Sequence, residues 1–201
     1  MTNPIIFAVA GIPASGKSSF IQEKMKENFF PEEVFIHDCD AVMDSLKGYQ
    51  SDLQSLGSAI AFQNWELPAR ALAESMLMEA IHARQNIIYD RSCALPSSYL
   101  FLKEVVELHR YTLVMHVLDV SKEEAHSRAK EREKETGRQV PEEFFLERKK
   151  GLKALWPAYL KLAKQCCVYD SNTRPLQLIA SGCDPKLTIL DKKKYALFLK
   201  R

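Results

Sequence analysis

The sequence predicts an α/β fold in which a mostly parallel sheet is covered by helices on both faces. Apolar runs of strand length alternate along the chain with segments of helical period, which is typical of β-α-β units. The chain has 201 residues, of which 46% are hydrophobic, so it can bury one sizeable core. We therefore predict a single domain over residues 1–201.

The apolar runs place the strands, and the helical periods fill the gaps between them. Strands are expected at residues 4–10, 34–37, 86–89, 111–118 and 167–170, with a further strand at 176–180. Helices are expected at residues 16–28, 68–84, 97–109, 122–133 and 141–164. Pro68 and Pro141 would each lie in a first helical turn, where the missing N–H has no partner to lose. The polar segment 131–139 is expected to be a mobile loop between two helices.

Charge and cysteine content narrow the functional classes. The chain has 28 basic and 26 acidic residues, a net charge of +2, without a long basic stripe, which disfavours nucleic acid as a partner. The five cysteines form no C-x-x-C pair, so we expect a reducing compartment and no zinc. The apolar run at residues 5–12 is too short to cross a bilayer. We expect a cytoplasmic protein without a membrane partner.

A phosphate-binding loop is the strongest motif. Residues 11–18 read G-I-P-A-S-G-K-S and match G-x-x-x-x-G-K-[ST] between a strand and a helix. In such a loop the backbone N–H groups face the phosphates, Lys17 neutralises the β- and γ-phosphates of ATP, and Ser18 ligates Mg²⁺. The alternative is a glycine-bearing turn that binds nothing. The predicted nucleotide-binding residues are Gly11, Ile12, Pro13, Ala14, Ser15, Gly16, Lys17, Ser18 and Ser19.

Carboxylates follow the second and third expected strands, at the edge of the sheet where a ligand would lie. Asp40 is the preferred base for an attacking hydroxyl, although either Asp38 or Asp40 could instead cap a helix. Asp90 ends the third strand as a Walker B aspartate does and would hold Mg²⁺ opposite Ser18, unless it is a turn or cap residue. Arg91 and Ser92 follow at the same rim and could contact either the phosphates or the acceptor, with Ser92 a candidate acceptor contact.

Arginines near the expected polar loop are candidates for stabilising a transferred phosphoryl group. Arg128 and Arg132 are four residues apart and share a helix face, and Arg138 lies in the loop beyond them. A lid over about residues 128–141 would bring them to the phosphates. We favour Arg128 and Arg138, because acidic neighbours make Arg132 equally consistent with a solvated helix surface.

With these residues in place, the chain resembles the zeta toxin family of P-loop kinases from residue 5 to about residue 172. The resemblance implies a P-loop kinase fold, with the family's base on Asp40 and its lid arginines on Arg128 and Arg138. It also implies a sugar contact at Glu74, which we expect to face Asp40 across one cavity. In place of the family's glycine, this chain has Arg91.

The chemistry expected is transfer of the γ-phosphate of ATP, with Mg²⁺, to a hydroxyl of a small molecule. Characterised members of the family phosphorylate a UDP-amino sugar, so the resemblance implies that acceptor class and also an antitoxin-like protein partner. Asn172 lies where many P-loop kinases hold adenine, although an ordinary turn explains it equally. The alternatives are a polynucleotide 5′-hydroxyl kinase and a non-catalytic switch that binds nucleoside triphosphate.

Overall fold

The central element is one mixed sheet with the strand order β2-β3-β1-β4-β5-β6-β7. The computed structural model describes residues 3–136 and 140–200, and the sheet is built from strands within these ranges. The strands are β1 (Ile5–Ala10), β2 (Val34–His37), β3 (Asn86–Asp90), β4 (Thr112–Asp119), β5 (Gln165–Asp170), β6 (Gln177–Gly182) and β7 (Thr188–Ile189). The predicted strands are confirmed to within two residues at their ends.

Parallel pairing brings the carboxyl ends of the first five strands to one edge of the sheet. β1 pairs in parallel with β3 and β4, β2 pairs in parallel with β3, and β5 pairs in parallel with β4. β6 and β7 add antiparallel strands beyond β5. The loops that follow β1, β2, β3 and β5 therefore meet along one edge, which is where ligands bind in open α/β sheets.

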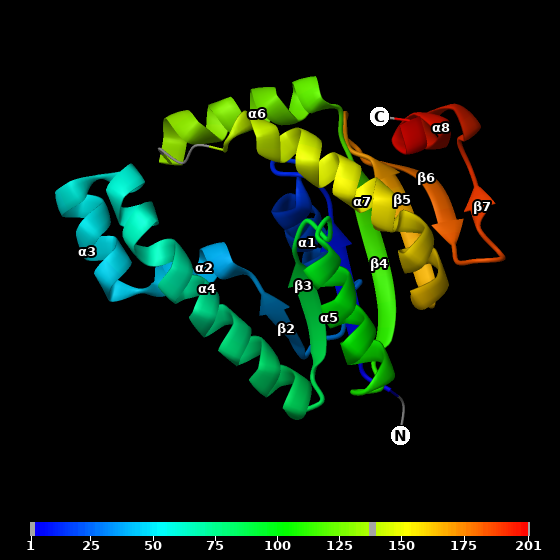
Figure 1. Ribbon diagram of the computed structural model, residues 1–201, viewed down its shortest axis with the longest axis horizontal. Helices are drawn as coiled ribbons and strands as arrows, with labels where there is room; N and C mark the ends of the chain where they lie inside the picture. Colours follow the sequence, from blue (N-terminus) through cyan, green and yellow to red (C-terminus); the bar gives the residue numbers. More distant parts are fainter. Residues whose placement is uncertain (1–2, 137–139, 201) are drawn as a thin grey trace.

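Helices cover both faces of this sheet. The helices are α1 (Lys17–Lys26), α2 (Cys39–Ser45), α3 (Lys47–Leu56), α4 (Ser58–His82), α5 (Pro96–Glu107), α6 (Lys122–Thr136), α7 (Glu142–Leu162) and α8 (Lys192–Lys200). Figure 1 shows α5 and α7 in front of the sheet and α1 behind it. The larger core joins one face of the sheet to side chains of α4, α5, α7 and α8, whereas Phe20 and Ile21 of α1 pack against the other face. The predicted layering is confirmed.

The helix predicted from Pro68 is longer than expected, and Pro68 lies within it. α4 begins at Ser58, ten residues before the proline, so the prediction of a first-turn position was wrong. Interior proline is costly because it removes one hydrogen bond and crowds the preceding turn. Here Ala61 and Ala69 are buried on either side of Pro68, in a small core with Met43 and Tyr49. Tertiary packing therefore maintains the helix through the proline.

α2, α3 and the first half of α4 extend beyond the β2 edge of the sheet (Figure 1). In this region the indole Nε1 of Trp65 donates a hydrogen bond of 2.9 Å to Asp52 Oδ2. A Cβ on Gly48 would overlap the ring of Trp65, so α3 and α4 approach closely only because residue 48 is glycine. The three helices thus form a small unit with its own core, placed beside the carboxyl end of β2.

The second difference concerns the predicted loop at residues 131–139. α6 continues to Thr136, so Arg128 and Arg132 both lie on a helix, and residues 137–139 are outside the described chain. Pro141 is the N-cap of α7 and directly precedes its first turn.

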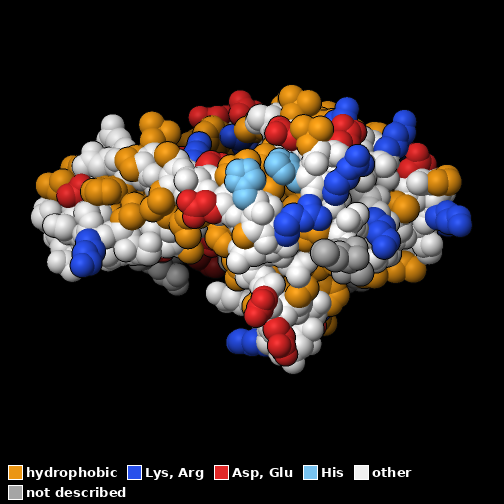
Figure 2. All heavy atoms as spheres, turned by 90° about the horizontal axis from the view of Figure 1, so that it is seen from below, with side chains coloured by type: hydrophobic (Ala, Val, Ile, Leu, Met, Phe, Trp, Pro, Cys, Tyr) orange, Lys and Arg blue, Asp and Glu red, His pale blue; other side chains and the backbone are white. Residues whose placement is uncertain are grey.

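On the underside of the molecule, basic and acidic side chains are interspersed with hydrophobic ones (Figure 2). Within the ranges described, no helix is long and apolar enough to cross a membrane.

Candidate active site

The loop between β1 and α1 has the backbone shape of a phosphate cradle. Gly11, Ala14 and Gly16 have φ values of 152°, 57° and 92°. A Cβ on Gly11 would overlap Ser15 Oγ and lie 2.8 Å from the carbonyl oxygen of Leu118, so a larger residue cannot be accommodated there. The loop leads directly into α1, whose first-turn N–H groups favour an anion. The glycine spacing of the motif is therefore required by the close packing of the loop.

The predicted cradle residues have different environments. Gly11, Pro13, Ala14, Lys17 and Ser18 line a cavity of about 490 Å³ at this edge of the sheet. The remaining predicted residues are not among those that line the cavity. Ile12 and Ser15 are buried, Gly16 is half-buried and Ser19 is exposed.

Lys17, Ser18 and Asp90 meet at the floor of this cavity, which we call the phosphate cavity. The ammonium of Lys17 lies 3.8 Å from Asp90 Oδ1. The hydroxyl of Ser18 donates a 3.4 Å hydrogen bond to Asp90 Oδ2. Burial raises the pKa of the Asp90 carboxyl above its ordinary value of 3.8; Lys17 opposes this shift, and Asp38 and Asp40 add to it. A hydroxyl facing a carboxylate across this gap suits Mg²⁺, which binds oxygen ligands and also offsets the repulsion among the acids.

The two aspartates after β2 have separate roles. Asp38 is the N-cap of α2, and its Oδ1 accepts hydrogen bonds from the backbone N–H groups of Asp40 and Ala41, at 2.9 and 3.2 Å. Asp40 lies in the first turn of α2 and lines the phosphate cavity together with Lys17 and Asp90. The capping alternative therefore applies to Asp38. The carboxylate of Asp40 shares a cavity with the predicted phosphate-binding groups.

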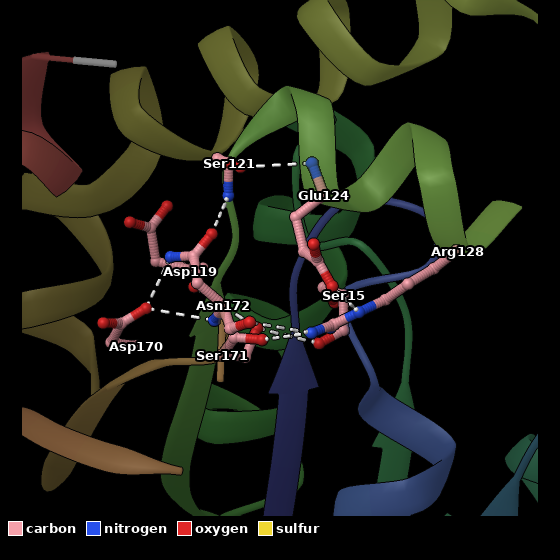
Figure 3. A network of polar contacts seen from close by, with 8 residues as sticks. All are labelled: Ser15, Asp119, Ser121, Glu124, Arg128, Asp170, Ser171 and Asn172. Atoms are coloured by element: carbon pink, nitrogen blue, oxygen red, sulfur yellow. Dashed lines mark hydrogen bonds and ion pairs between the residues drawn. The ribbon is translucent and has the colours of Figure 1, made fainter. Parts of the chain in front are cut away.

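Arg128 lies beside the phosphate loop and is held by carbonyl groups (Figure 3). Its guanidinium donates to the backbone oxygens of Ser171 and Asn172, at 2.8 and 3.3 Å, and to Glu124 Oε1 at 2.8 Å. The hydroxyl of Ser171 in turn donates to the carbonyl oxygen of Ser15, at 2.9 Å. α6 is thus tied through Arg128 to the loop after β5 and, through that loop, to the phosphate cradle.

Arg132 lines the phosphate cavity itself, whereas Arg138 lies outside the described residues. Sequence reasoning preferred Arg138 because acidic neighbours suggested a solvated position for Arg132. It also missed Arg148 of α7, which lines the same cavity. Arg174, which follows the expected adenine position, lies close to the phosphate loop: its guanidinium would be 3.0 Å from a Cβ on Gly16. The RxxxR spacing gave a usable signal for Arg132. Arg148 reaches the cavity only through the packing of α7.

Asn172 has both ends of its side chain engaged in the loop after β5. Its Oδ1 accepts a 2.8 Å hydrogen bond from the backbone N–H of Ser121, and its Nδ2 donates a 2.5 Å hydrogen bond to Asp170 Oδ1 (Figure 3). Asp170 also accepts from the backbone N–H of Asn172, at 3.0 Å. These contacts shape the loop that borders the cradle. Adenine recognition by Asn172 stays a prediction.

A second cavity, of about 410 Å³, adjoins the phosphate cavity, and we call it the arginine cavity. Its lining includes Arg70, Arg91 and Arg148, together with Glu74, and the two cavities share Arg91, Ser92 and Arg148. The stacked rings of Tyr89 and Phe101, with centroids 5.3 Å apart, contribute apolar surface. The arrangement provides guanidinium groups for an anion beside aromatic faces for a ring.

Glu74 lies in the arginine cavity, where its carboxylate forms an ion pair with Arg91. Asp40 lines the phosphate cavity, so the two residues line adjoining cavities and not the one common cavity that the sequence led us to expect. Arg91, the residue that replaces the family's glycine, lies at the boundary and pairs with the residue that the resemblance assigned to the sugar.

The fold and the site together define a kinase-like phosphotransferase of the P-loop class. The loop after β1 has the phosphate-binding motif, the Asp90 carboxylate faces the serine of that motif, and Asp40 lines the same cavity, which together are parts that phosphoryl transfer uses. A family model described as zeta toxin matches residues 2–172, most of the chain. The chain belongs to the zeta toxin family.

Solved structures with the same fold have low sequence identity to the chain. A chain of the PezAT chromosomal toxin-antitoxin system of Streptococcus pneumoniae has a TM-score of 0.70 and 13% identity, over 98% of this chain and 85% of that one. A chain of the AvrRxo1-ORF1:-ORF2 complex with ATP has a TM-score of 0.75 and 12% identity, over 98% of this chain and 64% of that one. A chain of the Pnkp1/Rnl/Hen1 RNA repair complex has a TM-score of 0.57 and 18% identity, over 79% and 47%. Among curated proteins, none matches the chain significantly.

Proposed function

We propose that the protein transfers the γ-phosphate of ATP to a hydroxyl of an anionic small molecule, with a UDP-amino sugar as the acceptor class. The observation that carries the proposal is that Lys17, Ser18, Asp90 and Asp40 line one cavity. This set contains a cation for the phosphates, two oxygen ligands for Mg²⁺ and a carboxylate for the acceptor. Family membership and the phosphate loop support ATP as the donor.

The donor binds with its phosphates on the backbone N–H groups of the loop and the first turn of α1. Lys17 neutralises charge on the β- and γ-phosphates, and Ser18 and Asp90 would hold Mg²⁺. When bound, Mg²⁺ neutralises charge that develops on the phosphate oxygens. Arg132 and Arg148, which line the same cavity, add positive charge near the transferred group.

Asp40 orients the acceptor hydroxyl and takes its proton as the oxygen attacks the γ-phosphorus. The bond between the acceptor oxygen and phosphorus forms, the bond to the β–γ bridging oxygen breaks, and ADP leaves with the electron pair of that bond. Asp40 suits this role because it lines the cavity from the first turn of α2, whereas the carboxylate of Asp38 caps that helix.

The acceptor occupies the arginine cavity and extends its hydroxyl toward Asp40. Arg70, Arg91 and Arg148 provide charge for a diphosphate, and Tyr89 and Phe101 provide apolar surface for a ring. Ser92 lines both cavities and can contact the acceptor where they meet. An antitoxin-like partner and a cytoplasmic location are further parts of the proposal, and both rest on family membership.

The decisive experiment compares Asp40→Asn with Asp44→Asn, a matched change on the same short helix. Phosphate transfer from labelled ATP is measured with UDP-amino sugars, and ATP binding is measured separately. Asp40→Asn should lower transfer at least about 100-fold while ATP affinity stays within about threefold, and Asp44→Asn should retain transfer. Equal transfer by Asp40→Asn and the unaltered protein would remove the assignment of the base.

A second arm separates the acceptor classes. The RNA repair neighbour makes a polynucleotide 5′-hydroxyl kinase the competing function. An oligonucleotide with a free 5′-hydroxyl should remain unlabelled under conditions in which the sugar nucleotide is phosphorylated. Labelling of the oligonucleotide alone would replace the proposed acceptor, and ATP binding without transfer to any hydroxyl would favour the switch.

A further inference from the structure

Three metal-binding side chains of different chemistry converge beside the two cavities. His37 is the last residue of β2, Cys39 is the first residue of α2, and Glu74 lies on α4. His37 Nε2 is 3.9 Å from Cys39 Sγ and 3.8 Å from Glu74 Oε1. Ligand atoms of all three side chains lie within 4.8 Å of one another.

These separations are close to those around a tetrahedral zinc ion. Zinc binds sulfur at about 2.3 Å and nitrogen or oxygen at about 2.0–2.2 Å. Two ligands at tetrahedral angles are then roughly 3.3–3.6 Å apart. The observed separations from His37 Nε2 exceed this range by only a few tenths of an ångström, so side-chain rotation alone could close the gap.

The environment of His37 supports this role. The residue is 1% exposed, and its ring stacks on Tyr89 with centroids 5.3 Å apart and an interplanar angle of 9°. A neutral imidazole offers a lone pair on one of its two ring nitrogens, which makes histidine a common metal ligand. Nε2 faces the cluster with only the long approaches to Cys39 Sγ and Glu74 Oε1, and Nδ1 is buried near the Ala73 backbone without a hydrogen bond of ordinary geometry.

A buried imidazole with such weak partners calls for a physical reason, because buried polar groups are normally satisfied. A cation on Nε2 would satisfy that nitrogen and leave the ring proton on Nδ1, toward the backbone, an arrangement common for metal-bound histidine. The cluster is also accessible: Cys39 lines the phosphate cavity, and Glu74 lines the arginine cavity.

We propose that His37, Cys39 and Glu74 bind one zinc-class divalent cation, with water as a fourth ligand. The donor set of nitrogen, sulfur and oxygen favours zinc over magnesium, which prefers oxygen ligands. Cys39 binds as the thiolate and releases its proton to solvent, so the thiolate and the Glu74 carboxylate together balance two positive charges. Oε1 of Glu74, the oxygen near His37, also accepts from Arg91, so the cation and the guanidinium would share this carboxylate.

No cysteine–histidine spacing motif predicts this site, because the ligands lie on β2, α2 and α4. Sequence reasoning expected no zinc on the basis of the missing C-x-x-C pair. Glu74 is 35 residues from Cys39 in the numbering, and the two meet only because α4 packs against β2 and α2. The test of the site measures metal binding alone, so its outcome does not depend on the proposed kinase function.

The test uses reduced full-length protein with excess Mg²⁺, so that the oxygen site at Ser18 and Asp90 is occupied. Calorimetry with Zn²⁺ should show one site, and Co²⁺ should produce a near-ultraviolet thiolate-to-metal absorption band. Cys39→Ser should abolish the band and weaken Zn²⁺ binding at least about tenfold. Cys183→Ser, the matched change at the other half-buried cysteine, should leave both unchanged.

Glu74→Gln provides a second variant and should also weaken Zn²⁺ binding about tenfold or more. Circular dichroism of each variant confirms that it is folded. An unchanged Zn²⁺ affinity in folded Cys39→Ser, a band that depends on Cys183, or failure of the unaltered protein to bind Zn²⁺ would each overturn the proposal.

Discussion

The guanidinium of Arg91 is ion-paired with the carboxylate of Glu74 where the phosphate cavity meets the arginine cavity. Arg91 follows Asp90 directly, so the end of β3 faces the expected metal and also borders the expected acceptor. The pair places a cation and an anion side by side at the boundary between the two cavities.

Arg91→Gly should weaken binding of a UDP-amino sugar by about tenfold or more, because one charged hydrogen-bond donor leaves the arginine cavity. Binding of ATP should change less, since Lys17 and the loop N–H groups remain. Calorimetric titration of each ligand measures both effects. Arg110→Gly, at an exposed residue with φ of 56°, is the control for loss of one positive charge. Tighter sugar binding by Arg91→Gly would contradict the assignment of the cavity.

Asp90→Asn should retain or gain thermal stability without ligand at pH 8 and lose most of the stabilisation by Mg²⁺ and ATP. Burial raises the pKa of the Asp90 carboxyl, so its ionised form disfavours the folded state. The contribution of Asp90 to stability is therefore full below its ordinary pKa of 3.8 and is lost as pH rises through the higher folded value. Asp90→Asn should therefore be more stable than the unaltered protein at pH values above the raised pKa of Asp90. Melting temperatures against pH, with and without ligand, check both expectations.

Two buried histidines should make the protein sensitive to mild acid. Burial lowers the pKa of His116 to about 4, and burial with Arg91 lowers that of His37 to about 4. A histidine whose pKa is lowered in the folded state stabilises the protein above pH 6.5, the ordinary pKa of histidine. This stability is lost as the pH falls toward 4. The free energy of unfolding should fall by about 2–3 kcal/mol per histidine across this window.

His116→Gln tests one of these contributions, with His82→Gln as the control at an exposed histidine. Urea unfolding at a series of pH values should show a smaller acid loss for His116→Gln and an unchanged loss for His82→Gln. Identical pH profiles for His116→Gln and the unaltered protein would rule out a role for this imidazole, which packs against Phe20 and Tyr169.

Gly151→Ala should destabilise the protein by about 1–3 kcal/mol, although the same change in an exposed helix is stabilising. A Cβ on Gly151 would overlap the carbonyl oxygen of Ala94, so α7 would have to move away from the segment after β3. Ala154→Gly, at an exposed position of α7, measures helix propensity alone and should cost about 1 kcal/mol. Stabilisation by Gly151→Ala in urea unfolding would show that α7 can shift freely.

Local patterns were sufficient for the strands, the phosphate loop and the carboxylates after β2 and β3. Glycine spacing, alternation and strand-end position depend on backbone sterics within a few residues. The sequence could therefore place Gly11, Lys17, Asp40 and Asp90 at one edge of the sheet, where they line one cavity. The same local rules failed at Pro68, where burial of Ala61 and Ala69 maintains the helix against the proline. They also left open which aspartate caps α2.

The sequence by itself determined the α/β class, the cradle and the edge of the sheet where chemistry would occur. Only the tertiary structure placed Arg148 in the cavities, separated Glu74 from Asp40, and brought Glu74 beside His37 and Cys39. The physical reason is that contacts between distant segments follow from how helices pack across the sheet. That packing depends on the combined burial of many side chains, which no short motif records.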